Sequence, residues 1–123
     1  MAKILIIDDS LTITKTLEVF LKGKGHEILT AEDGETGLSM AKKHVPDLIL
    51  LDIMLPKLNG YEVCNMLKMD AAYSHIKIIM FTAKVGEDSK TMSLETGADL
   101  YMTKDLDAEV VLNKVEELLK KKK

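Results

Sequence analysis

Residues 3–9 read Lys-Ile-Leu-Ile-Ile-Asp-Asp, a short run of branched apolar residues that ends in two carboxylates. Such an apolar run is typical of a strand buried on both faces, as the strands of a parallel sheet are. Similar runs recur along the chain, and longer stretches with helical periodicity separate them. The sequence therefore predicts an α/β fold built from successive βαβ units.

Five strands are expected from this pattern, at residues 3–7, 26–30, 47–51, 77–81 and 99–102. Apolar residues at helical spacing follow each strand, and Asp107 is expected to cap the last helix. The helix expected at residues 88–95 has the weakest pattern, with Met92 and Leu94 as its apolar anchors. Most glycines fall near the element boundaries, where we expect left-handed or tight-turn conformations.

The length of 123 residues suits one domain, so we expect residues 1–123 to form a single unit with a frayed lysine tail at residues 120–123. The net charge is −3, and every basic residue is lysine, which argues against a direct role in nucleic-acid binding. No apolar stretch has membrane-spanning length, and the single cysteine, Cys64, favours a core position. We expect a cytoplasmic protein without membrane insertion.

Polar residues that could bind a ligand or take part in catalysis follow the ends of the expected strands. Asp8 and Asp9 follow the first strand, Asp52 the third and Thr82 the fourth, while Lys104 lies just beyond the fifth. The carboxyl ends of parallel strands share one edge of the sheet, where ligands bind in doubly wound folds. These five side chains should therefore converge.

Three carboxylates packed together repel one another unless protons or a cation neutralise them. Mg²⁺ prefers oxygen ligands, so Asp9 and Asp52 suit direct ligation, with Asp8 acting through water. Asp52 has the chemistry of a nucleophile that forms an aspartyl phosphate, while Lys104 and Thr82 offer a charge and a hydroxyl donor to phosphoryl oxygens. The set predicts a Mg²⁺-dependent phosphoryl-transfer site.

Simpler interpretations exist for each of these residues taken alone. Asp8, Asp9 and Ser10 could cap the first helix, Asp52 could open a turn, and Thr82 could fill a strand position. One such residue at the end of each of several strands is the observation that favours a shared site over these separate roles.

Four motifs give the chain a clear resemblance over essentially its whole length. They are Ile-Ile-Asp-Asp-Ser at 6–10, Leu-Leu-Asp-Ile-Met-Leu-Pro at 50–56 with Gly60 following, Phe-Thr-Ala at 81–83, and Gly-Ala-Asp at 97–99 leading to Tyr101 and Lys104. With these motifs the chain resembles the response-regulator receiver domains of two-component signalling, including the chemotaxis-type receivers. The resemblance implies a flavodoxin-like, doubly wound (βα)5 fold with a five-stranded parallel sheet in the order 2-1-3-4-5.

The resemblance also implies a role for each matching residue. Asp52 would be the phosphoacceptor, and Thr82 and Lys104 would contact the phosphoryl group. Asp8, Asp9, Asp52 and the backbone carbonyl of Met54 would bind Mg²⁺, with Mn²⁺ as a possible substitute. Thr82 and Tyr101 would act as switch residues.

The function implied is that of a phosphoacceptor switch, not of a conventional enzyme. Such a domain catalyses its own phosphorylation and dephosphorylation, and takes its phosphoryl group from a sensor histidine kinase or a histidine phosphotransfer protein. Phosphorylation shifts the surface formed by the fourth helix, fifth strand and fifth helix towards a state that controls a downstream protein. The protein would be a monomer or a phosphorylation-dependent dimer.

The chain departs from the family pattern after Lys104, where Asp105 replaces the usual proline. A cis bond before a residue other than proline costs about 3 kcal/mol, so we expect a trans Lys104–Asp105 bond. Impaired switching would leave a constitutive protein-binding receiver as the alternative function. The resemblance also assigns Met54 and Lys84 to tuning the phosphoryl lifetime, and Met54 disfavours a phosphatase with a paired Asp-x-Asp site.

Overall fold

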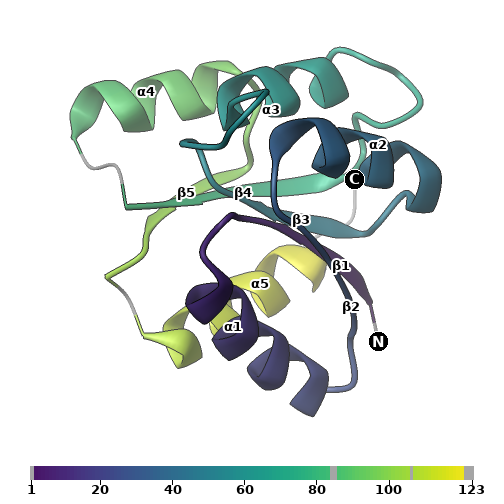
Figure 1. Cartoon of the computed structure of the whole chain (residues 1–123), viewed down its shortest axis with the longest axis vertical. Coiled ribbons are helices and arrows are strands. Elements are labelled where there is room, and N and C mark those ends of the chain that lie inside the picture. The colour runs from purple at the N-terminus through teal and green to yellow at the C-terminus, as the bar shows by residue number, and fades with distance from the viewer. Residues whose placement is uncertain (1, 84–85, 106, 121–123) are drawn as a thin grey trace.

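The computed structural model describes residues 2–83, 86–105 and 107–120. Strands and helices alternate along the chain (Figure 1). The elements are β1 (Lys3–Ile7), α1 (Leu11–Gly23), β2 (Glu27–Ala31), α2 (Gly34–His44), β3 (Leu48–Leu51), α3 (Gly60–Lys68), β4 (Lys77–Thr82), α4 (Glu87–Glu95), β5 (Leu100–Thr103) and α5 (Ala108–Lys120).

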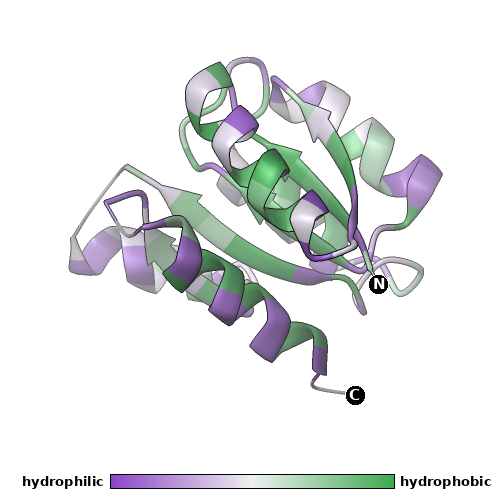
Figure 2. Cartoon of the chain, turned by 90° about the horizontal axis from the view of Figure 1, so that it is seen from below, coloured by the Kyte–Doolittle hydropathy of each residue, from purple (hydrophilic) through white to green (hydrophobic). Residues whose placement is uncertain are grey.

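The five strands form one parallel sheet in the order β2-β1-β3-β4-β5, which confirms the expected topology. Helices α1 and α5 cover one face, and α2, α3 and α4 cover the other (Figure 1). Alternate residues of each central strand enter opposite cores, so Ile4 and Ile6 pack with α1 and α5, while Leu5 and Ile7 pack on the other side. This two-sided burial explains the continuous apolar runs of β1, β3 and β4, which Figure 2 shows in green.

Each expected strand corresponds to an observed one, and no strand end differs from its expected position by more than one residue. The expected strand at residues 26–30 is Glu27–Ala31, the third begins at Leu48, and the fifth is Leu100–Thr103. The fourth ends at Thr82, which was expected to follow it. Pairing with a neighbouring strand sets these ends: Thr82 is the register partner of Thr103, so it belongs to the ladder.

The expected apolar anchors of α4 were wrong. Met92 and Leu94 are 48% and 44% exposed, whereas Ser89 and Ser93 are buried. The end of α4 is held by hydrogen bonds: the Thr96 hydroxyl donates to the carbonyl of Ser93, and the Cys64 thiol of α3 donates to the carbonyl of Thr96. The buried side of α4 is therefore the one that carries Ser89 and Ser93.

The glycines divide into two groups. A positive φ, as the sequence predicts for turns, occurs at Gly25, Gly86 and Gly97. Gly23, Gly34 and Gly60 were expected in turns between elements but belong to helices: Gly23 ends α1, and Gly34 and Gly60 begin α2 and α3 without a positive φ. Close backbone contacts, described below, require glycine at the last two positions.

The last helix begins as expected, because the Asp107 carboxylate accepts a hydrogen bond from the backbone N–H of Val110 at 3.0 Å. Lys120 is the last residue of α5, and the remainder of the expected lysine tail, residues 121–123, lies outside the described residues. Within the described part of the chain, every helix is too short or too polar to cross a membrane.

Candidate functional site

Two neighbouring strands bring Asp8 and Asp52 together. Ile7 at the end of β1 is the register partner of Leu51 at the end of β3, so the next residue of each strand emerges at the same edge. The backbone N–H of Asp52 donates to the carbonyl of Ile7 at 3.0 Å, which continues the ladder to the site. The carboxylates are therefore fixed by the rigid centre of the sheet.

Asp9 completes a group that we call the acidic cluster, made of Asp8, Asp9 and Asp52. One carboxylate oxygen from each lies within 4.8 Å of the others. Asp8 and Asp52 are buried and Asp9 is exposed. Three carboxylate oxygens this close, one of them open to solvent, fit a hard divalent cation that retains water ligands.

Lys104 reaches this cluster from the end of β5. Its backbone N–H donates to the carbonyl of Thr82 at 2.9 Å, which holds it beside β4. Its Nζ lies 2.7 Å from Asp8 Oδ2 and 3.1 Å from Asp52 Oδ2, and its side chain is 10% exposed. The ammonium group therefore bridges the two buried carboxylates.

The departure at Asp105 does not prevent this contact. All peptide bonds of the described residues are trans, which confirms the expectation for Lys104–Asp105. The Asp105 carboxylate accepts a hydrogen bond from the hydroxyl of Thr103. The Asp105 side chain is thereby hydrogen-bonded to the last residue of β5, while Lys104 still reaches Asp8 and Asp52.

The pKa values within the site reflect competition between burial and charge. Burial raises the pKa of Asp8, and the hydrogen bonds from Lys104 and Ser10 only partly oppose this effect. For Lys104, burial lowers the pKa, but the hydrogen bonds and charges of Asp8 and Asp52 together outweigh it and leave the pKa raised. The lysine therefore stays charged, and Asp8 ionises less readily than an exposed carboxyl group.

Thr82 and Tyr101 lie on one face of the sheet. Met80 is the register partner of Tyr101, and both pack on the side of α2 and α3. Thr82 follows Met80 by two residues and so faces the same side. Tyr101 is half-buried. Burial is the main cause that raises the pKa of its hydroxyl, and the nearby Tyr61 raises it further. The two expected switch residues thus share a face.

The loop after β3 carries Met54, and its backbone N–H donates to Asp52 Oδ1 at 3.4 Å. The loop ends at Asn59, which forms a capping box with Glu62 at the start of α3. We did not identify this box from the sequence, although the Asn-x-x-Glu spacing is a recognisable signal. Lys84, the other expected tuning residue, lies outside the described residues.

The simpler interpretations receive partial support. Ser10 occupies the N-cap position of α1, but its side chain makes no capping hydrogen bond. Instead, its backbone N–H donates to Asp8 Oδ1 at 2.9 Å. Thr82 does fill a strand position and is fully buried. These local roles coexist with the convergence of the acidic cluster and Lys104.

Comparisons with known proteins agree with this arrangement. The model of the "Response regulator receiver domain" family matches residues 4–116. Protein PilH of Pseudomonas aeruginosa is 40% identical over 119 residues, which cover 97% of this chain and 98% of PilH. The alkaline phosphatase synthesis transcriptional regulatory protein PhoP of Bacillus subtilis is 43% identical over 97% of this chain, but the chain spans only 49% of PhoP.

A solved structure extends the similarity to three dimensions. The putative response regulator from Chloroflexus aurantiacus superposes with a TM-score of 0.91 at 30% identity, and the match covers 98% of each chain. The strand order, the acidic cluster and the family match therefore point to one conclusion. The chain belongs to the response regulator receiver domain family.

Proposed function

We propose that this receiver domain works as a Mg²⁺-dependent switch in which Asp52 accepts a phosphoryl group. The observation that carries the proposal is the convergence of three carboxylates at one edge of the sheet, two of which, Asp8 and Asp52, lie within 3.1 Å of Lys104 Nζ. The proposed donor is a phosphohistidine of a sensor histidine kinase or a histidine phosphotransfer protein. The proposed location of this exchange is the cytoplasm.

The proposed metal ligands are Asp8, Asp9, Asp52 and the backbone carbonyl of Met54. Their oxygen atoms suit Mg²⁺, and Mn²⁺ has similar ligand preferences. When bound, the cation would withdraw charge from phosphoryl oxygens. Asp9 is the exposed member of the acidic cluster, so the site is accessible from solvent on its side.

In the proposed transfer, an oxygen of Asp52 bonds to phosphorus while the bond from phosphorus to the donor histidine nitrogen breaks. The electron pair of the broken bond remains on the imidazole. Lys104 is positioned by Asp8 to place its charge against a phosphoryl oxygen, and Thr82 supplies a hydroxyl donor. These groups act by position and charge, which is how proteins accelerate phosphoryl transfer.

The proposed output is a shift of the α4–β5–α5 surface. Thr82 and Tyr101 share one face of the sheet, so a movement of Thr82 towards the phosphoryl group would change the space available to Tyr101. Differential contacts of the phosphoryl group with two pre-existing states would drive the shift. A downstream protein would read this surface, and the domain would act as a monomer or as a phosphorylation-dependent dimer.

The constitutive protein-binding receiver remains the second candidate, because Asp105 departs from the family pattern. The contact of Lys104 with both carboxylates favours the switch over this candidate. The two differ in one measurable property: a constitutive receiver binds its partner equally with and without a phosphodonor.

The test is to incubate the wild type and Asp52→Asn with acetyl phosphate and Mg²⁺ and to read the intact mass in cold acid. We expect the wild type to gain one phosphoryl group, about 80 Da, and Asp52→Asn to gain none, because its amide is not a nucleophile. A folded wild type that gains no mass would contradict the switch and favour the constitutive receiver.

A further inference from the structure

Gly34 occupies a position where its own backbone conformation does not require glycine. It is the first residue of α2, next to the N-cap Asp33, and it lacks a positive φ. Alanine is the better helix former, so glycine at an ordinary helical conformation is a sign of close packing. Gly34 is also buried.

The close packing is against the loop that follows β3. A Cβ at Gly34 would stand 1.7 Å from the carbonyl oxygen of Leu58 and 2.6 Å from its carbonyl carbon. The backbone N–H of Gly34 donates to the carbonyl of Pro56 at 3.3 Å. The start of α2 and this loop are therefore in direct backbone contact.

The same loop, residues 53–59, is held on its other side by the start of α3. A Cβ at Gly60 would stand 2.1 Å from the backbone oxygen of Asp52, and the N–H of Gly60 donates to the carbonyl of Ile53 at 2.8 Å. Within the loop, Lys57 has a φ of 72°. A left-handed lysine persists where surrounding contacts determine the backbone.

We propose that Gly34 is a positioning residue for phosphoryl transfer, because its backbone contact with Leu58 fixes the loop that carries Met54 and adjoins Asp52. This inference rests on the function proposed above. Gly34 touches neither the donor nor the metal; it acts through the loop. The residue lies in α2, outside the strand-end residues that form the site.

The size of the effect follows from the contact. Real Cβ atoms essentially never approach other heavy atoms within 3.0 Å, so a methyl group at position 34 requires a displacement of more than 1 Å from its 1.7 Å contact. The nearest atom is backbone, which cannot rotate away as a side-chain end would. A misplacement of about 1 Å at a transfer site can lower the rate by about 100-fold.

The experiment compares Gly34→Ala with two controls. Gly23→Ala makes the same change at the end of α1, where a Cβ meets nothing within 4 Å. Lys68→Met is a destabilised control on α3, where it removes the hydrogen bond from Lys68 Nζ to the carbonyl of Ile76. Urea unfolding establishes that each variant is folded, and calorimetric titration gives the Kd for Mg²⁺. Intact mass gives the rate of phosphorylation by acetyl phosphate at saturating Mg²⁺.

We expect Gly34→Ala to be phosphorylated about 10- to 100-fold more slowly at saturating Mg²⁺ and to bind Mg²⁺ more weakly, while both controls match the wild type. A folded Gly34→Ala with wild-type rate and affinity overturns the inference. An equal loss in Lys68→Met also overturns it, since general destabilisation would then explain the result. A wild type that neither binds Mg²⁺ nor gains a phosphoryl group refutes the proposed function itself and this inference with it.

A second pair of variants applies if Gly34→Ala does not fold. Asp33→Ala removes the cap, in which the Asp33 carboxylate accepts from the N–H of Thr36 at 2.7 Å, and so loosens the first turn of α2 without adding atoms. Asp33→Asn removes the same charge but keeps a capping side chain. Slower phosphorylation and weaker Mg²⁺ binding in Asp33→Ala than in Asp33→Asn support the inference, and equal values overturn it.

Discussion

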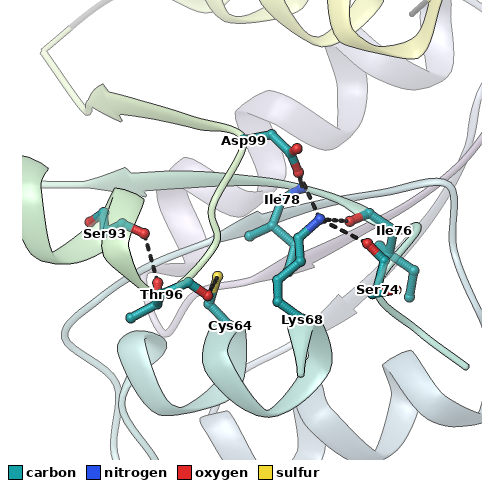
Figure 3. Close-up of polar contacts among 8 residues, drawn as sticks. All are labelled: Cys64, Lys68, Ser74, Ile76, Ile78, Ser93, Thr96 and Asp99. Atoms are coloured by element: carbon teal, nitrogen blue, oxygen red, sulfur yellow. Dashed lines mark hydrogen bonds and ion pairs between the residues drawn. The ribbon is translucent and has the colours of Figure 1, made fainter. Parts of the chain in front are cut away.

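Lys68 and Lys104 both have largely buried side chains and lie near opposite ends of the strands. They differ in how many negative charges surround each of them. Lys68 of α3 donates to the carbonyls of Ser74 and Ile76, at 3.1 and 2.7 Å, and to Asp99 Oδ2 at 3.0 Å (Figure 3). We call these four residues the Lys68 cluster. It contains one positive charge, one negative charge and an acceptor for each of three N–H donors.

Lys104 faces a different environment. It contacts Asp8 and Asp52, and Asp9 adds a third carboxylate to the same edge. When all three carboxylates are ionised, one lysine leaves two negative charges unmatched. A balanced cluster stabilises the fold, whereas excess negative charge in the acidic cluster favours the binding of a cation.

The largest expected effect concerns Lys104. Lys104→Met removes the charge that faces the acidic cluster while keeping an apolar stem, so phosphorylation of Asp52 should slow by about 100-fold or more. The affinity for Mg²⁺ should rise, because a fixed cation no longer competes for the carboxylates. Intact-mass kinetics and calorimetric titration measure the two effects, with Lys68→Met as the control. If Lys104→Met were phosphorylated at the wild-type rate, Lys104 would serve only to neutralise the carboxylates in the folded protein.

The second effect concerns stability at the other end of the sheet. Lys68→Met leaves two carbonyls and the Asp99 carboxylate without their lysine, so the free energy of unfolding should fall by about 2 kcal/mol. Urea denaturation measures this value. Lys22→Met is the matched control: it breaks a pair with Glu18 in which Lys22 is 56% exposed, and it should cost less than about 0.5 kcal/mol. Equal losses in the two variants would mean that burial of the Lys68 cluster adds nothing.

The smallest effect is a pH dependence at Asp8. Because burial raises the folded-state pKa of Asp8, its contribution to stability is fully present below the unfolded value of 3.8 and is lost as pH rises through the folded value. Near neutral pH without metal, Asp8→Asn should therefore be more stable than the wild type, and this difference should shrink on acidification.

Urea denaturation across this pH range, in the presence of a chelator, measures the dependence. Asp9→Asn serves as the control, because Asp9 is exposed. If Asp8→Asn lowered stability at neutral pH, the ion pair with Lys104 would outweigh the cost of burying Asp8. The contrast between the Lys68 cluster and the acidic cluster would then fail.

Much of the architecture was predictable from local pattern. The apolar runs predicted the strands within about one residue at most ends, because burial on both faces imposes a composition that periodicity detects. Five side chains were expected to converge, and the structure confirms this for Asp8, Asp9, Asp52 and Lys104, since parallel strands share one carboxyl edge. The buried face of α4 was not predictable, because its apolar residues, Met92 and Leu94, are two positions apart and therefore lie on different sides of the helix.

The sequence by itself determined the alternation of strands and helices and the chemical groups at the strand ends, because both depend only on residues close together in the chain. Tertiary structure alone decided that Lys104 bridges Asp8 and Asp52, that Lys68 closes on Asp99, and that Gly34 lies against Leu58. These contacts join residues at least 24 positions apart, so they depend on strand register and loop paths. A sequence pattern places a charge or a glycine on an element, but only the packed fold sets what lies opposite it.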